Sequence, residues 1–365
     1  MTRADVLVVS LGTTLGWRLA DRLFLDQLER AGASAVAASV SFGAAGRLRR
    51  GYPVNDLVEM HAARRATRTA VARHSPRAVV FSSTTAAMLA PPLQVPYAVR
   101  LDAPAVLNRP GARNALLHAL ERRGLRRARL TLPLSGAASE VLPAGSAPAV
   151  VVPPPVEPSG PANEEREPLA VAYVPDPKAK GLDILAAGWA AAGLHDARLE
   201  VYGLDPDWAR AHLRRSGVPE PSGFELRGTV PAPQFRARIR QARVYAGGAR
   251  WEDFGQAPLE ALADGALLAS VPSGGPFEAL RLAREIGEPD LIARELGGEA
   301  LGVAIRAAFE LPDERVRAYR TRVLSLLRPY RPEAVQETVA SEVLPRLLAP
   351  PAPTPRHRPR AGAGP

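Results

Sequence analysis

No cysteine occurs among the 365 residues, which excludes disulfide bonds and metal sites built on thiolates. Long apolar runs are also missing, because no stretch approaches the ~18 residues that a membrane-spanning helix requires. The first apolar run, Val6–Ser10, is far too short for a signal peptide. These absences predict a non-secreted, cytoplasmic protein.

Lysines and aromatic residues are scarce, and the basic charge is concentrated in one half of the chain. Aromatic residues make up 5% of the sequence, and the formal net charge is +10. Residues 1–150 carry 20 Lys and Arg against 9 Asp and Glu, whereas the remainder carries 27 against 28. Basic and aromatic residues do not alternate, so nucleic acid is not an expected partner.

The arginines of the first half form three clusters: Arg47, Arg49 and Arg50; Arg64, Arg65, Arg68 and Arg73; and Arg122, Arg123, Arg126, Arg127 and Arg129. One interpretation is contact with an anionic membrane surface, which would place the protein peripherally at the inner face of the cell membrane. The other is an arginine-rich composition on solvated helices. Both interpretations stay open at this point.

Short apolar runs alternate with longer amphipathic ones, which predicts a parallel α/β fold in two halves. The expected strands are residues 6–10, 35–41, 78–82, 97–101, 130–132, 149–152, 169–174, 198–202, 223–226, 242–246 and 267–271. The expected helices are residues 17–31, 56–73, 114–123, 182–191, 207–216, 233–241 and 257–263, with three further pieces in 297–347.

A run of three prolines, Pro153-Pro154-Pro155, precedes a polar, proline-rich stretch and predicts a break between domains. The expected organisation is a first domain (1–153), a linker (154–168), a second domain (169–330), a C-terminal helix (331–348) and a disordered tail (349–365). The tail is expected because it is rich in Pro, Ala and Arg.

The most informative segment, residues 251–260, places Glu252 and Glu260 eight positions apart around Phe254 and Gly255. It follows an expected strand and leads into an expected helix. A helix N-terminus presents backbone N–H groups to anions, and carboxylates beside it can accept hydrogen bonds from sugar hydroxyls. One module could therefore hold a phosphate and a sugar. The alternative is a pair of solvated glutamates at a helix start.

This segment resembles the Glu-x7-Glu signature of family 4 glycosyltransferases, which are retaining enzymes. The resemblance implies an α/β fold of the GT-B type, with two Rossmann-like domains facing a cleft and the C-terminal helix packing back towards the first domain. It also implies that Glu252 contacts donor sugar hydroxyls and that the backbone of Phe254 and Gly255 lies against sugar and diphosphate. Glu260 would bind the ribose of the nucleotide.

Two further segments of the second half resemble the same family. Lys180-Gly181 resembles the end of a Gly-Arg-(x)n-Lys-Gly loop that holds the donor diphosphate, although its arginine is missing near Val174. Lys180 is the expected phosphate contact, and Lys178 is a candidate substitute for the missing arginine. The turn at residues 228–231 resembles a Gly-x-Val-Pro turn, whose backbone at Val230 would contact the base.

The first half offers weaker signals. The glycines of residues 11–16, Gly12 and Gly16, follow the first strand and are expected to face the donor. Arg100 and Asp102 end a strand where many relatives have a histidine beside the reacting sugar carbon. We expect Asp102 to act there and Arg100 to contact the acceptor, and a structural Arg100–Asp102 pair is the alternative.

No metal or other cofactor is expected. The Asp205-Pro206-Asp207 sequence formally matches a metal-binding pattern, but Asp207 is better explained as a helix cap. The predicted function is transfer of a hexosyl group from a nucleotide diphosphate sugar to an acceptor hydroxyl, with retention. The acceptor is expected to be lipid-linked or otherwise anionic, and the competing interpretation is that it is a small soluble molecule. The alternatives are a catalytically impaired nucleotide-sugar-binding relative, or scaffold, and a hinge-type binding protein.

Overall fold

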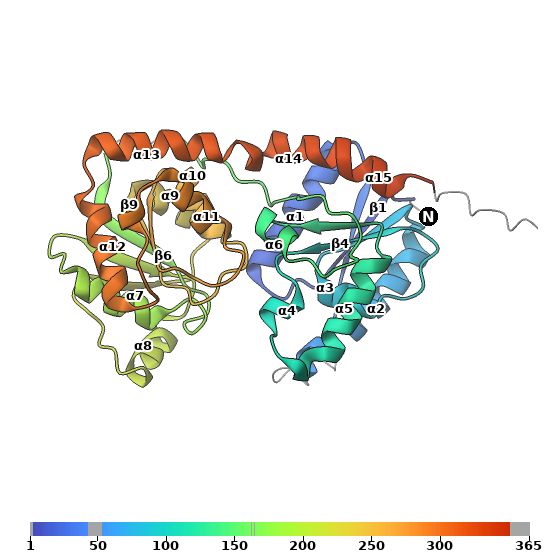
Figure 1. Cartoon of the computed structure of the whole chain (residues 1–365), viewed down its shortest axis with the longest axis horizontal. Helices are drawn as coiled ribbons and strands as arrows, with labels where there is room; N and C mark the ends of the chain where they lie inside the picture. The colour runs from blue at the N-terminus through green and yellow to red at the C-terminus, as the bar shows by residue number, and fades with distance from the viewer. Residues whose placement is uncertain (1–2, 43–52, 162, 164, 351–365) are drawn as a thin grey trace, which may run out of the picture.

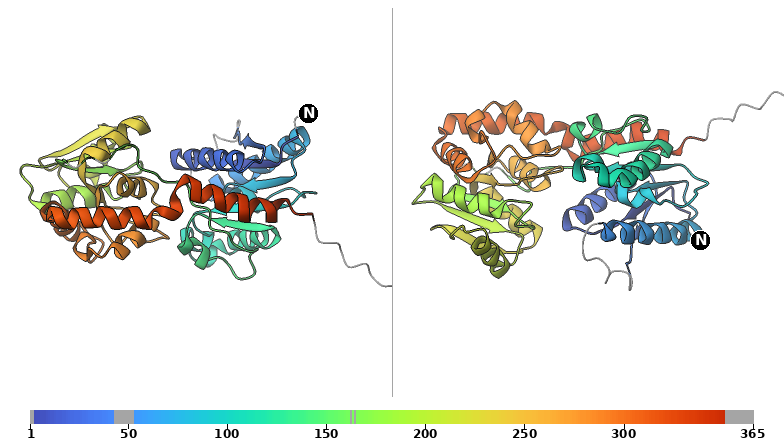
Figure 2. Two further views of the ribbon diagram at one scale, coloured as in Figure 1. Left: turned by 90° about the horizontal axis from the view of Figure 1, so that it is seen from above. Right: turned by 60° about the horizontal axis from the view of Figure 1, so that its bottom comes forward.

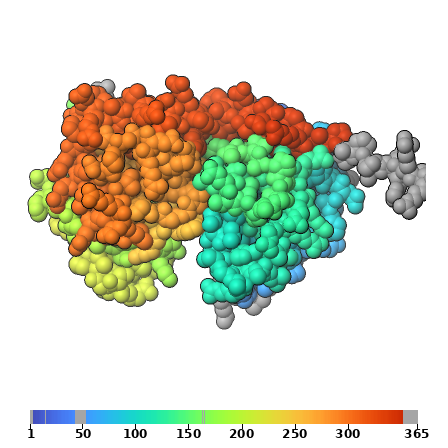
Figure 3. Space-filling model, in the orientation of Figure 1, coloured from blue at the N-terminus to red at the C-terminus, as the bar shows by residue number. Residues whose placement is uncertain are grey.

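The protein consists of two α/β domains that lie side by side, as a computed structural model of the chain shows (Figure 1). The structure describes residues 3–42, 53–161, 163 and 165–350. The predicted tail therefore lies, from residue 351 onward, outside the described residues, as does the basic cluster of Arg47, Arg49 and Arg50. A space-filling view shows the two domains in contact beneath the helices that cross between them (Figure 3).

The N-terminal domain is built on five parallel strands in the order β2-β1-β3-β4-β5. Their bounds are β1 (Val6–Ser10), β2 (Ala35–Ser39), β3 (Ala78–Phe81), β4 (Tyr97–Leu101) and β5 (Leu130–Pro133). Both faces of the sheet are covered, which explains why these strands are largely apolar. The strand expected at 149–152 is wrong: this segment forms only an isolated bridge, between Ala149 and Thr131.

Helices cover the two faces of this sheet unequally. The helices are α1 (Leu15–Arg30), α2 (Val54–His74), α3 (Thr84–Met88), α4 (Ala105–Asn108), α5 (Ala115–Arg127) and α6 (Gly136–Glu140). Helix α1 packs on one face, and α2, α3 and α5 pack on the other. Three helices start at a hydroxyl cap just after a strand, because Thr14, Ser83 and Ser135 each accept a backbone N–H.

The C-terminal domain has a second parallel sheet, in the order β10-β9-β6-β7-β8. Its strands are β6 (Glu167–Tyr173), β7 (Arg198–Tyr202), β8 (Phe224–Gly228), β9 (Ala242–Gly247) and β10 (Leu267–Ser270). Its helices are α7 (Leu182–Ala192), α8 (Pro206–Arg215), α9 (Ala232–Gln241), α10 (Gln256–Ala263), α11 (Glu278–Ile286), α12 (Gly298–Glu310) and α13 (Asp313–Leu326).

Two segments cross between the domains and meet each other. The first runs through Val156, whose N–H donates to the carbonyl of Tyr330 on the second (2.7 Å). The second continues into the C-terminal bridge, which we define as α14 (Pro332–Thr338), the π-helical turn η5 (Val339–Val343) and α15 (Leu344–Leu348). Seen from above, the bridge runs from one domain onto the other (Figure 2).

The C-terminal bridge belongs to the core of the N-terminal domain. Its buried side chains pack with those of β1 and α1, and they are Val335, Val339, Val343, Leu344 and Leu347. None of the helices in the described ranges has the length and apolar character needed to cross a bilayer.

In each sheet the chain reverses its direction of travel next to the domain's first strand. These switch points lie between β1 and β3 and between β6 and β9. In open parallel sheets, ligands bind beyond the carboxyl ends of the strands at such points. The loops that follow β1, β3, β6 and β9 are therefore where a functional site is expected.

Candidate active site

The loops after β6 and β9 pack directly against each other at the switch point. Asp176 shapes the first loop, because its Oδ1 accepts the N–H groups of Lys178 and Ala179, both at 2.9 Å. Gly181 follows with a φ of +63°, and a Cβ there would lie 2.0 Å from the carbonyl oxygen of Gly248 in the second loop. Only glycine fits this approach, so the two loops are held in register.

This packing brings together two of the predicted donor contacts, Lys180 and Glu252. Lys180 Nζ lies 2.6 Å from Glu252 Oε1, and the Glu252 side chain is 16% exposed. Burial raises the pKa of Glu252, and the ammonium of Lys180 opposes that rise. The pair presents one cation and one carboxylate at the carboxyl end of the C-terminal sheet.

Glu252 and the residues after it are fixed by a glycine loop that follows β10. The N–H of Glu252 donates to the carbonyl of Gly274 (3.0 Å). A Cβ on Gly275 would lie 2.3 Å from the carbonyl oxygen of Glu252, so this approach also requires glycine. Gly255, with a φ of +83°, starts α10 and leaves the first backbone N–H groups of the helix without intrahelical partners. Phe254 is buried in the domain core.

Glu260 lies one turn further along α10. Its Oε1 accepts a hydrogen bond from Gln256 Nε2 (3.0 Å) and lies 3.8 Å from an arginine nitrogen of Arg236 on α9. Burial raises the pKa of Glu260, against the opposing effect of Arg236. The carboxylate is therefore partly buried, positioned by two neighbours, and still 16% exposed.

Two other predicted donor contacts lie in this domain. Val230 follows β8 and packs at the edge of the domain core, after Gly228 turns the chain with a φ of +73°. The side chain of Lys178 is exposed. Its carbonyl oxygen accepts from Arg250, whose guanidinium also pairs with both carboxylate oxygens of Asp183 (2.9 and 2.6 Å). Sequence reasoning did not single out Arg250.

A small pocket of about 210 Å³ faces this module from the N-terminal domain. It lies at the other switch point, and its lining residues are Leu11, Gly12, Thr13, Trp17, Glu59, Ser82, Ser83, Thr84, Thr85, Met88, Asp102, Ala103, Ala105, Asn108, Arg109, Leu117 and Asp253. Asp253 comes from the C-terminal domain and directly follows Glu252. The pocket is therefore built by both domains.

Asp102 and Asp253 approach each other across the domain boundary. Burial, with the negative charge of Asp253 as the second cause, raises the pKa of Asp102 to about 7. Asp102 Oδ1 accepts the N–H of Ala103 (2.8 Å), and Asp253 Oδ1 accepts the indole N–H of Trp251 (2.8 Å). The sequence prediction placed Asp102 in the cleft and missed Asp253, although it directly follows Glu252.

The remaining predicted residues of the first half lie in different environments. Gly12 lines the pocket with a φ of +59°, and its carbonyl oxygen accepts from Arg18 (2.9 Å). Gly16 lies within α1 and is not among the lining residues. Arg100 is 1% exposed and forms its ion pair with Asp21 (2.9 Å). Its positive charge also lowers the pKa of Asp102, so the alternative of an Arg100–Asp102 pair holds as an electrostatic interaction and not as a direct ion pair. We do not assign Arg100 a contact with an acceptor.

The Asp-x-Asp pattern serves as a helix cap, but through a different residue than expected. Asp205 Oδ1 accepts the N–H groups of Asp207 and Trp208, both at 3.0 Å, and therefore caps α8. Asp207 lies in the first turn of the helix with its side chain exposed. Within the parts of the chain that the structure describes, no group of three or more His, Asp and Glu side chains could hold a metal ion.

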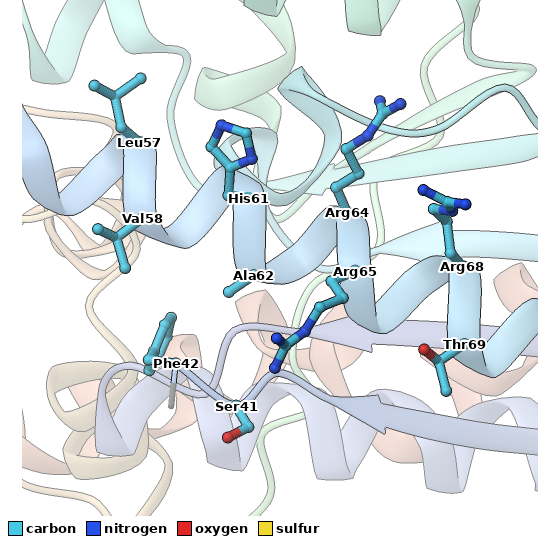
Figure 4. Close-up of a pocket in the computed structure, with 10 residues that line it drawn as sticks. All are labelled: Ser41, Phe42, Leu57, Val58, His61, Ala62, Arg64, Arg65, Arg68 and Thr69. Atoms are coloured by element: carbon cyan, nitrogen blue, oxygen red, sulfur yellow. The ribbon is translucent and has the colours of Figure 1, made fainter. Parts of the chain in front are cut away.

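A second cavity, of about 800 Å³, lies along α2. Figure 4 shows Arg65 pointing towards Ser41 and Phe42, whereas Arg64 and Arg68 point away from them. Arg64 is bound to the carbonyl oxygen of Leu89 (3.1 Å). This cavity shares no residue with the pocket beside Glu252.

Three solved structures of similar fold are distant from this chain in sequence. Sucrose-phosphate synthase from Thermosynechococcus elongatus is 15% identical, with 92% of this chain and 96% of that chain covered and a TM-score of 0.71. A trehalose-6-phosphate protein from E. coli, bound with UDP-2-fluoro glucose, is 11% identical, with 93% and 98% covered and a TM-score of 0.67. The HepE protein of Anabaena, in complex with UDP and glucose, is 13% identical, with 93% and 98% covered and a TM-score of 0.65.

No protein-family model matches the sequence, and no curated protein matches it either. The structural likeness extends over nearly the whole of both chains in each of these three cases. At these identities the likeness establishes the fold. The chain therefore has the two-domain α/β fold of the GT-B glycosyltransferases, and the fold that the sequence resemblance implied is confirmed.

Proposed function

We propose that the protein is a retaining glycosyltransferase that moves a hexosyl group from a nucleotide diphosphate sugar to an acceptor hydroxyl. The observation that carries the proposal is the Lys180–Glu252 pair (2.6 Å) at the carboxyl end of the C-terminal sheet. Lys180 supplies a cation for the diphosphate, and Glu252 beside it supplies a carboxylate for the sugar. Glu260 lies one helical turn into α10. The pocket with Asp102 lies opposite, where an acceptor could enter.

Each residue of the donor module has a role in this proposal. Lys180 stabilises negative charge on the diphosphate as it leaves, and Glu252 orients the sugar through its hydroxyls. The backbone N–H groups at Phe254 and Gly255 contact sugar and diphosphate, Glu260 accepts the ribose hydroxyls, and the backbone at Val230 contacts the base. Lys178 is a second, mobile phosphate contact.

Retention requires no nucleophile from the protein in this scheme. The leaving diphosphate takes the proton of the acceptor hydroxyl on the same face of the sugar, while the acceptor oxygen forms the new bond to the anomeric carbon. Asp102 holds the acceptor or shields positive charge at that carbon, and Gly12 lets the chain approach the donor from the opposite side. No metal ion takes part. Relatives of this fold that hold UDP, or UDP-2-fluoro glucose, support a UDP-sugar as the donor.

The proposal for the cellular site rests on the arginines of the N-terminal domain. Arg65 and Arg68 on α2 are exposed, as are the four arginines of α5, and both helices lie on the same side of the sheet. A cytoplasmic protein with this face could bind an anionic membrane surface peripherally, at ~1 kcal/mol per engaged arginine, and reach a lipid-linked acceptor. Co-sedimentation with anionic but not neutral vesicles, weakened by salt, is the expected result. Indifference to both vesicle types at low salt would contradict it.

The donor proposal is tested by calorimetry and hydrolysis with UDP-, GDP-, ADP- and TDP-sugars. We expect one nucleotide series to bind the unaltered protein and to be slowly hydrolysed. Glu252→Gln should remove hydrolysis and keep nucleotide binding. Glu310→Gln, an exposed glutamate at the end of α12, is the matched control and should change neither. Failure of all four series to bind would contradict the proposal.

A catalytically impaired relative, or scaffold, is the second candidate. It is favoured by one observation: no arginine stands near Val174, and Asp102 replaces the histidine that the resemblance would place beside the reacting carbon. This candidate predicts tight binding of a nucleotide sugar without hydrolysis or transfer in any of the four series. Turnover that Glu252→Gln abolishes would exclude it.

A further inference from the structure

The pocket between the domains is acidic, in contrast to the basic domain that forms most of it. Three carboxylates line it, those of Glu59, Asp102 and Asp253. Arg109 is the arginine among its lining residues, and its guanidinium is already paired with both carboxylate oxygens of Asp56 (2.8 and 2.9 Å). Asp102 and Asp253 therefore present to a bound acceptor two acidic groups in a domain boundary whose N-terminal side is basic overall.

Asp102 and Asp253 have no cation in direct contact among the described residues, and the positive charge that acts on Asp102 is that of Arg100. Their hydrogen bonds come from neutral donors, the N–H of Ala103 and the indole N–H of Trp251. Neither takes part in an ion pair in the part of the chain that the structure describes. Arg100, which lies closest to Asp102 in the sequence, is occupied by Asp21 at 2.9 Å. Two carboxylates from opposite domains thus face one cavity.

The rest of the lining suits a polyhydroxylated molecule. Four consecutive hydroxyl residues, Ser82, Ser83, Thr84 and Thr85, follow β3 into the pocket, and Thr13 faces it from the loop after β1. Trp17 on α1 adds an aromatic side chain, which can attract a ligand cation through its π-face. Trp17 also packs against the apolar cluster of the C-terminal domain, so it closes the pocket between the two domains.

A protonated amine between the two aspartates would turn their repulsion into two charge-assisted hydrogen bonds. A phosphate at the same place would meet uncompensated carboxylates. We propose that Asp102 and Asp253 select an acceptor that carries a protonated amino group beside its hydroxyls, that is, an amino sugar or an aminocyclitol. The proposal rests on the function proposed above, and it assigns Asp253 as the specificity-determining residue.

The test uses the whole protein saturated with UDP at pH 6.8, where the amine of glucosamine is mostly protonated. Binding of glucosamine, N-acetylglucosamine, glucose and glucose 6-phosphate is measured by calorimetry. We expect glucosamine to bind about tenfold or more tightly than its uncharged N-acetyl counterpart, and glucose 6-phosphate to bind most weakly. Glucosamine binding equal to that of N-acetylglucosamine, no binding of glucosamine, or preference for glucose 6-phosphate would overturn the proposal.

Asp253→Asn should abolish the preference for glucosamine over N-acetylglucosamine and leave the affinity for UDP unchanged. Asp102→Asn should reduce the same preference, which provides a second variant if Asp253→Asn does not fold. Asp207→Asn, whose side chain is 95% exposed on α8, is the matched control and should keep the preference. A preference unchanged in both pocket variants would overturn the proposal. If the unaltered protein binds UDP but does not prefer glucosamine, only the acceptor proposal fails. If it binds no nucleotide, the proposed function fails as well.

Discussion

Lys180 Nζ lies 2.6 Å from Glu252 Oε1, although 72 residues separate the two in the chain. Lys178 and Lys180 are the only lysines in the sequence. In this arginine-rich protein, the ammonium group of Lys180 lies where the proposed donor's diphosphate would bind. The ammonium and the carboxylate are each other's ion-pair partners in this structure.

Glu252→Ala should abolish glycosyl transfer, because the partly buried carboxylate that would orient the sugar hydroxyls is lost. Product formation from the donor identified in the nucleotide-sugar panel is the measurement. The variant should still bind the free nucleotide, which shows that it is folded. Transfer at the rate of the unaltered protein would exclude Glu252 from the site.

Glu260→Ala should weaken nucleotide binding by ~1–3 kcal/mol, the usual contribution of a charge-assisted hydrogen bond. Calorimetry with the free nucleoside diphosphate measures this directly. Gln256 and Arg236 would lose their shared partner, so thermal unfolding should be recorded alongside. Unchanged nucleotide affinity in a folded variant would remove Glu260 from the ribose site.

Asp102 should make the free energy of unfolding depend on pH. Its pKa is raised to about 7, so between about pH 4 and pH 7 the folded state holds a proton that the unfolded state has lost. The contribution of Asp102 to the free energy of unfolding is therefore fully present below about pH 4 and is lost as the pH rises through 7. The facing groups are Asp253, Glu59 and the paired Arg100.

Asp102→Asn should remove this dependence. Urea unfolding at pH 4 and at pH 8 measures the free energy of unfolding. From pH 4 to pH 8, the free energy of unfolding of the variant should rise by ~2–4 kcal/mol relative to that of the unaltered protein. Asp207→Asn should behave like the unaltered protein at both values. A variant whose difference from the unaltered protein is constant across the range would show that Asp102 titrates normally.

Transfer should survive an excess of EDTA. The Asp205 carboxylate is used to cap α8, and the described ranges contain no alternative group of metal ligands. The assay is product formation before and after dialysis against chelator. Loss of activity that Mn²⁺ or Mg²⁺ restores would return Asp205 and Asp207 to consideration.

Leu347→Ala should destabilise the protein by ~2–5 kcal/mol, because it empties a fully buried position where the C-terminal bridge meets the N-terminal sheet. Leu324→Ala, at a position 40% exposed on α13, is the control and should cost less than ~0.5 kcal/mol. Urea denaturation measures both. Equal midpoints for the two variants would mean that the bridge does not support the core.

The sequence predicted the parts of this molecule that depend on local patterns. Short runs rich in apolar and aromatic residues predicted β1, β4 and β7 to the residue, and each of these strands is almost wholly buried. It did not predict α3, α4 and α6, which are one or two turns long and lack a helical period. The 149–152 segment was misassigned because an apolar run after a strand does not reveal whether a partner strand is available.

The candidate site divides in the same way. Glu252, Glu260 and Lys180 belong to motifs of recognisable spacing. The structure brings Lys180 and Glu252 within hydrogen-bond distance of each other. Arg100 pairs with Asp21, 79 residues away, and Asp102 meets Asp253 across the domain boundary. Such partners depend on how two sheets are placed relative to one another, which no local pattern records.

The C-terminal bridge fixes the order in which the molecule can be assembled. The domain that begins the chain needs Val335, Val339, Val343, Leu344 and Leu347 to complete its core. During synthesis these residues emerge only after the other domain has been made, and domains generally fold as units in the order in which they emerge. The first domain to leave the ribosome is thus the last to be finished, with the apolar surface beside α1 waiting for residues more than 300 positions downstream.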